Sequence, residues 1–131
     1  MHPKTAFAPM LIIKDGIAAV EFYKNAFGAT ELRRFANDDG TIHVSELAIE
    51  ENIFLIREEN AARGHFDAAL IGGTTVLLGL FVEDPHAVQQ QALEAGATEL
   101  VPVTDHDETG YREGSVKDPF GQTWLILKKF K

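Results

Sequence analysis

The order of hydrophobic and polar positions predicts one helix among four strands in the first half of the chain. Strand-like apolar runs occupy residues 7–13, 29–35, 41–49 and 53–57. Between the first two runs, apolar residues recur at helical spacing from Ile17 to Phe27. Asp15 is a typical N-cap and Gly28 a typical helix stop. Residues 37–40, Asn-Asp-Asp-Gly, are a strong hairpin signal.

The second half of the chain repeats this order. Strands are predicted over residues 74–82, 97–103, 111–117 and 122–130. A helix is predicted over residues 86–95, because Asp84-Pro85 is a cap with proline at the first helical position, and Gly96 follows. We expect a polar loop at residues 104–110 and a tight Asp-Pro-Phe-Gly turn at residues 118–121.

A short phrase also occurs twice. Gly-Ala-Thr-Glu-Leu at residues 28–32 returns at residues 96–100, each time after a predicted helix. The pattern predicts an α+β fold in a single domain, residues 1–131, made of two βαβββ modules at about 6–58 and 74–131. Each module is expected to form a curved mixed sheet with a helix on one face, and the two open faces to enclose a shared cleft for a ligand.

Residues 58–73 show little periodicity and contain three glycines. We interpret residues 59–73 as the linker between the modules. Two alternatives remain, a helical turn within the linker and a mobile loop over a site.

Composition narrows the classes of function. The chain has no cysteine, which excludes disulfides, thiolate metal ligands and a cysteine nucleophile. Its net charge of −8 disfavours nucleic acid as a partner. No apolar run approaches the length of about 20 residues that spans a bilayer, and the start lacks the apolar core of a signal peptide. We therefore expect a cytoplasmic protein without a membrane partner.

Several segments resemble one family. They are residues 19–29, 42–47, 82–85, 95–98 and 114–124. Together with the paired βαβββ order, they resemble the vicinal oxygen chelate superfamily, which includes glyoxalase I, extradiol dioxygenases, and bleomycin and fosfomycin resistance proteins. Within it they are most similar to the PhnB-like subgroup. The resemblance implies the paired-module fold and a homodimer.

The resemblance also implies four metal-binding positions, one on the first and one on the fourth strand of each module. In this chain they hold Ala8, Leu55, Leu77 and Leu125, with Arg57 or Glu58 as alternatives to Leu55. Aliphatic side chains supply no ligand atom to a divalent metal. We therefore expect neither the usual metal nor another cofactor.

An apolar cleft is expected in place of the metal centre. By strand alternation its lining would be Ala8, Met10, Ile12, Leu55, Leu77, Gly79, Phe81, Leu125 and Leu127. The opposite strand faces would pack under the helices through Leu11, Ile13, Leu80, Val82, Trp124 and Ile126.

Four polar or aromatic residues are candidates for ligand contacts. His43 is placed mid-strand on the cleft face, as a general base, a ligand contact or a histidine hydrogen-bonded within the sheet. Arg57 suits a carboxylate or phosphate, the alternative being an ion pair with Glu58 or Glu59. Tyr111 and Arg112 follow at the start of a strand, where the subgroup often has a Trp-Gly-x-Arg stretch.

The sequence is compatible with three functions. The first is a protein that binds a small, partly apolar molecule without metal, as bleomycin resistance proteins sequester their ligand. The second is a glyoxalase-type or dioxygenase-type enzyme with non-standard metal ligands such as His43 and Glu58. The third is metal-free catalysis through His43 and Arg57. Whether the protein is an enzyme stays open at this point.

Overall fold

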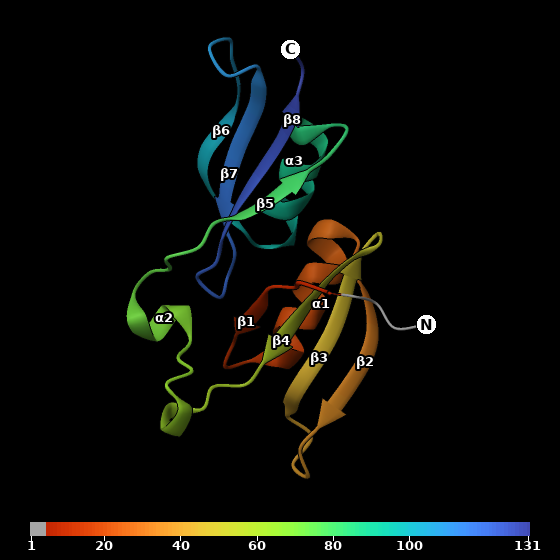
Figure 1. Cartoon of the computed structure of the whole chain (residues 1–131), viewed down its shortest axis with the longest axis vertical. Helices are drawn as coiled ribbons and strands as arrows, with labels where there is room; N and C mark the ends of the chain where they lie inside the picture. Colours follow the sequence, from red (N-terminus) through yellow and green to blue (C-terminus); the bar gives the residue numbers. More distant parts are fainter. Residues whose placement is uncertain (1–4) are drawn as a thin grey trace. The chain divides into compact units, whose positions relative to one another are not determined.

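The computed structural model describes residues 5–131, which divide into two compact units. The described part of the first unit comprises residues 5–24 and 28–66, and the second comprises residues 25–27 and 67–131. Each unit contains one four-stranded mixed sheet (Figure 1). The α+β class with two such sheets is therefore confirmed. Neither sheet is closed.

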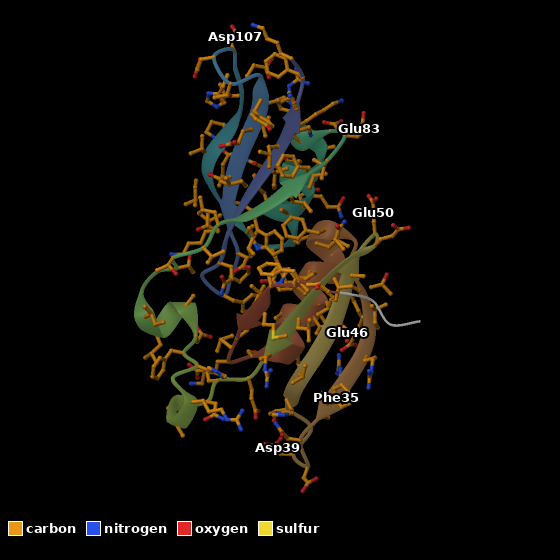
Figure 2. The ribbon with its side chains drawn as sticks, viewed as in Figure 1. Phe35, Asp39, Glu46, Glu50, Glu83 and Asp107 are labelled. Atoms are coloured by element: carbon orange, nitrogen blue, oxygen red, sulfur yellow. The ribbon has the colours of Figure 1, made fainter. Side chains whose placement is uncertain are left out.

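The first sheet is ordered β1-β4-β3-β2. The elements of this half are β1 (Met10–Ile12), α1 (Gly16–Phe27), β2 (Thr30–Ala36), β3 (Ile42–Ile49) and β4 (Asn52–Arg57). The predicted caps are confirmed, since Asp15 accepts a hydrogen bond from the Ala18 amide at 3.1 Å and Gly28 ends α1 at φ 69°. The β2–β3 hairpin is also confirmed, with Asp39 at its tip (Figure 2).

α1 covers one face of this sheet. The Tyr23 ring meets the Phe54 ring edge to face at 5.4 Å, and Leu47 and Ile56 are fully buried. The prediction that Leu11 and Ile13 are buried on the helix side is confirmed.

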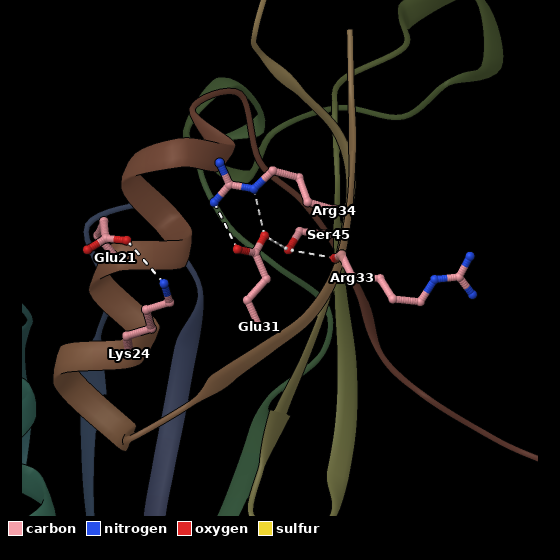
Figure 3. A network of polar contacts seen from close by, with 6 residues as sticks. All are labelled: Glu21, Lys24, Glu31, Arg33, Arg34 and Ser45. Atoms are coloured by element: carbon pink, nitrogen blue, oxygen red, sulfur yellow. Dashed lines mark hydrogen bonds and ion pairs between the residues drawn. The ribbon is translucent and has the colours of Figure 1, made fainter.

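A polar network joins β2 to β3 on the same side. Arg34 donates two hydrogen bonds to the Glu31 carboxylate, at 2.8 and 2.9 Å, and the buried Ser45 hydroxyl donates a third at 2.7 Å (Figure 3). The hydrogen bonds from Arg34 and Ser45 lower the pKa of the Glu31 carboxyl, against the opposing effect of its partial burial. The network favours the anionic form of Glu31, whose two carboxylate oxygens together accept these three hydrogen bonds.

The second sheet is ordered β5-β8-β7-β6. The elements after β4 are η1 (Ala61–Arg63), α2 (Ala68–Ile71), β5 (Leu78–Phe81), α3 (Pro85–Ala95), β6 (Thr98–His106), β7 (Tyr111–Lys117) and β8 (Thr123–Lys129). Asp84 caps α3 as predicted, accepting from the Ala87 amide at 3.2 Å. α3 packs on β6, β7 and β8, over a core that includes Val116, Trp124 and Ile126.

Three strand predictions were wrong in length. β1 and β5 are shorter than the apolar runs that contain them. β1 finds backbone partners on β4 at three positions only, and β5 finds partners on β8 at four. Residues 74–77 precede β5 without a strand partner. β6 extends to His106, where the predicted loop should begin, because Asp105 and His106 pair with Arg112 and Tyr111.

Residues 58–77, which connect β4 to β5 along the chain, contain more regular structure than a plain linker. They hold η1 and α2, so the alternative with a helical turn is confirmed. In residues 5–131 no helix is both long and apolar enough to cross a membrane.

Candidate functional site

A polar pocket of about 140 Å³ lies in the first unit, where β4 ends. Its lining residues are His43, Arg57, Glu58, Asn60, Arg63 and His65. The pocket therefore combines the start of β3 with the end of β4 and the loop that follows.

The loop is closed by its own backbone. Asn60 and His65 exchange two backbone hydrogen bonds, at 2.9 and 3.0 Å, around the single turn of η1. Gly64 ends that turn at φ 75°, a conformation that side chains with a Cβ rarely adopt. The arrangement holds Asn60, Arg63 and His65 at one side of the pocket.

Glu58 is held from two directions. Its Oε1 lies 2.9 Å from Nδ1 of His43, and its Oε2 accepts a hydrogen bond of 2.8 Å from Asn37. The hydrogen bond with His43 is the largest cause that lowers the pKa of the Glu58 carboxyl, and the hydrogen bond from Asn37 is the next. Glu58 is therefore an anion whose charge already has partners within the protein.

The arginines of the chain differ in their partners. Arg34 and Arg112 each bind a carboxylate, and Arg33 lies over the Phe35 ring at 4.8 Å. No carboxylate oxygen of residues 5–131 lies within 4.0 Å of Arg57 or Arg63. The alternative that Arg57 forms an ion pair with Glu58 or Glu59 is therefore wrong within the described chain.

His43 and Arg57 both line the pocket at the end of β4. Arg57 stands opposite Val44 in the β3–β4 ladder, and Ser45 stands opposite Ile56. A register shift of β3 against β2 falls between Ile42 and Val44, so the alternation that puts Ser45 and Leu47 under α1 does not fix the side of His43. His43 is the second residue of β3, and 51% of its side chain is exposed. The two candidate catalytic residues thus meet at this pocket, and their sharing one sheet face stays a prediction.

The apolar candidates of the first unit do come together. Met10 pairs with Leu55 and Ile12 with Arg57, so all four share the face away from α1. One Nη of Arg57 lies 3.9 Å from the Met10 sulfur. We call this set, Met10, Ile12, Leu55 and Arg57, the first open face.

A similar set occurs in the second unit. Phe81 pairs with Leu127 and Gly79 with Leu125, all away from α3, and the rings of Phe81 and Tyr111 lie 6.3 Å apart. We call Phe81, Tyr111 and Leu125 the second open face. Leu77 precedes β5 and is exposed, whereas Leu127 is buried.

Arg112 differs from the other candidates. It lies on the face opposite to Tyr111, donates to Asp105 at 2.7 and 3.2 Å, and stacks over the Phe130 ring. Its guanidinium is therefore occupied by a carboxylate of the protein.

The residues present do not fit the metal that the family implies. The positions that the resemblance implies hold Ala8, Leu55, Leu77 and Leu125, whose side chains carry no nitrogen or oxygen, and of the alternatives to Leu55 only Glu58 would supply a usual ligand. His43 and Glu58 supply two donors, and within residues 5–131 no group of three His, Asp or Glu side chains is placed to hold an ion.

Sequence reasoning missed Asn60, Arg63 and His65 as members of one pocket. The available signal was a run of polar residues around Gly64 in a segment already considered as a loop over a site. The Asn60–His65 pairing that gathers them is a backbone contact with no pattern in the sequence.

Comparison with known proteins identifies the family. Residues 7–126 match the model of the Glyoxalase/Bleomycin resistance protein/Dioxygenase superfamily. An uncharacterised protein of Mycobacterium bovis is 34% identical over 129 residues, which cover 96% of this chain and 84% of the relative. The structure of an Arabidopsis thaliana gene product matches at 33% identity and a TM-score of 0.75, covering 95% of this chain and 98% of that one.

A more distant structure shows the same fold. The fosfomycin resistance protein FosX of Listeria monocytogenes, solved with Mn(II) and sulfate, matches at 15% identity and a TM-score of 0.72, covering 97% of this chain and 91% of that one. The finer PhnB-like assignment stays a prediction. The chain belongs to the Glyoxalase/Bleomycin resistance protein/Dioxygenase superfamily.

Proposed function

We propose that this protein binds a small, partly apolar molecule on its open sheet faces without the divalent metal that its family implies. The observation that carries the proposal is the exposure of large apolar side chains on faces that no helix of their own unit covers. Met10 is 52% and Phe81 66% exposed. Clustered exposed apolar residues mark binding surfaces more often than solitary ones do.

The composition of the faces suits such a ligand. Binding sites for small molecules are mainly apolar and have few polar groups that fix orientation. The first open face offers Met10, Ile12 and Leu55 beside the guanidinium of Arg57. The second offers Phe81 and Leu125 beside the phenol of Tyr111. A ligand with an apolar body and one polar or anionic end would satisfy either set.

We do not extend the proposal to catalysis. Metal-free catalysis would need His43 and Arg57 to act on one substrate; both line the pocket at the end of β4, where Nδ1 of His43 already contacts Oε1 of Glu58 at 2.9 Å. The metal-dependent alternative lacks a set of three ligands in the described chain. Binding needs neither arrangement.

A thermal-shift screen of partly apolar, metabolite-sized compounds in the presence of EDTA tests the proposal. A ligand at 100 times its Kd should add about 2.7 kcal/mol to the free energy of unfolding. We expect Leu55→Ser to raise the Kd of the best compound by about tenfold, because the lost apolar contact accounts for 1–2 kcal/mol, roughly.

Leu70→Ser is the matched control, since Leu70 is 70% exposed on α2 and lies outside both open faces. Its Kd should equal that of the unmodified protein. The proposal fails if no compound stabilises the protein, or if Leu70→Ser weakens binding as much as Leu55→Ser does.

A further inference from the structure

The pocket at the end of β4 differs in chemistry from the open faces. All six lining side chains are polar or charged, and four of them are arginine or histidine. From this we propose that the pocket binds a small oxyanion, a phosphate or carboxylate group, through Arg57 and Arg63. The inference goes beyond the proposed function, because it requires no apolar ligand.

Charge balance is the first argument. Arg57 and Arg63 have no carboxylate partner in residues 5–131, whereas Glu58, the acid of the pocket, is held by His43 and Asn37. The pocket therefore carries an excess positive charge in a chain of net charge −8. A guanidinium binds carboxylate and phosphate oxygens in pairs, with charge-assisted hydrogen bonds.

Free hydrogen-bond donors are the second argument. The side chains of Asn60, Arg63 and His65 make no hydrogen bond or ion pair within residues 5–131. Their backbone, in contrast, is fixed by the Asn60–His65 pairing. A preformed loop that presents unpaired donors loses less entropy when it binds an acceptor than a flexible one does.

Size is the third argument. Pockets for drug-sized ligands have volumes of about 300–1,000 Å³. The volume of about 140 Å³ is too small for such a molecule and suits a single small anionic group. The oxyanion can be a free ion or the anionic end of a larger molecule that projects into solvent.

Titration of the purified protein with sodium phosphate and, separately, with sodium acetate tests the proposal. Binding is followed by amide chemical shifts at constant ionic strength. We expect at least one of the two anions to give saturable shifts at residues 58–65. Saturation by phosphate alone would assign a phosphate site, and saturation by acetate alone a carboxylate site.

Two variants and one control locate the site. Arg63→Gln and Arg57→Gln should each raise the Kd by about tenfold, the loss expected for one charge-assisted contact. Arg33→Gln removes the same charge from an arginine that lies over Phe35, outside the pocket, and has no carboxylate partner in residues 5–131. It should leave the Kd within twofold, roughly, of the original value, since a remote exposed charge is screened by salt.

The proposal is overturned if neither anion gives saturable shifts at residues 58–65. It is also overturned if Arg33→Gln weakens binding as much as Arg63→Gln does, because the effect would then be one of general charge. Arg57 belongs to both the pocket and the first open face, but Leu55 lies outside the pocket, so Leu55→Ser with apolar compounds tests the open faces separately.

Discussion

Replacing Asp118 with alanine is expected to lower the free energy of unfolding by about 3 kcal/mol, because several buried donors lose their acceptor together. Asp118 is 3% exposed. Its Oδ1 accepts from the amides of Phe120 and Gln122, at 2.9 and 3.0 Å, and its Oδ2 accepts from the indole nitrogen of Trp124 at 3.0 Å. Alanine would remove the acceptor that these groups share, and the indole lies inside the core of the second unit.

Urea denaturation of the purified protein measures this effect. Asp107→Ala is the control, because Asp107 lies in the exposed β6–β7 turn (Figure 2), where a substitution should change stability by no more than about 0.5 kcal/mol. Asp118→Asn, which keeps one carbonyl oxygen, should fall between the two. Equal midpoints for Asp118→Ala and Asp107→Ala would contradict this account of the turn.

Gly114→Ala is expected to cost about 2–3 kcal/mol, a large effect for one added methyl group. A Cβ at Gly114 would overlap Oε1 of Gln89 on α3 and would lie 2.8 Å from Cγ2 of Val103. Gln89 is buried, and its Nε2 is held by Glu99 at 3.0 Å and by the Val101 carbonyl at 2.9 Å. The amide therefore cannot rotate away without breaking those hydrogen bonds.

Chemical denaturation of Gly114→Ala, Gln89→Ala and the double variant measures the clash. The double variant should lose less than the sum of the single variants, because shortening Gln89 makes room for the new methyl group. Gly73→Ala serves as control, since a Cβ there meets nothing within 4 Å. Additive losses, or a similar loss for Gly73→Ala, would refute the proposed packing of α3 on β7.

Local signals predicted the helices well. The caps at Asp15 and Asp84 and the glycines at positions 28 and 96 fix α1 and α3 to within a residue or so of the expected bounds. These signals are local, because each cap satisfies backbone groups of the same turn. Strand alternation also predicted that Trp124 and Ile126 of β8 lie under a helix, whereas no helix-side residue of β4 was predicted.

Strand lengths depended on information that the sequence does not carry locally. The apolar run at residues 74–82 suits a long strand, but β5 exists only where β8 offers backbone partners, from Leu78 to Phe81. β6 is longer than its apolar run because β7 pairs with its polar end. In both strands the partner, and not propensity, decides the length.

The candidate site was predicted only in part, because its residues too are brought together by strand pairing. Alternation correctly grouped Met10, Ile12, Leu55 and Arg57 on one face, since these residues alternate on strands that pair directly. It could not fix the side of His43, because a register shift of β3 against β2 interrupts the alternation at that residue. The pocket around Arg63 needed the closed loop at residues 60–65, which arises from backbone pairing.

The central claim is that this member of the superfamily binds its ligand without the divalent metal of its family. Elemental mass spectrometry of the purified protein, after incubation with manganese, nickel, zinc and iron salts and desalting, tests it most directly. The account predicts far less than one metal ion per chain, because Ala8, Leu55, Leu77 and Leu125 offer no ligand atoms. About one tightly held ion per chain would contradict it and would direct the work to lyase and dioxygenase assays.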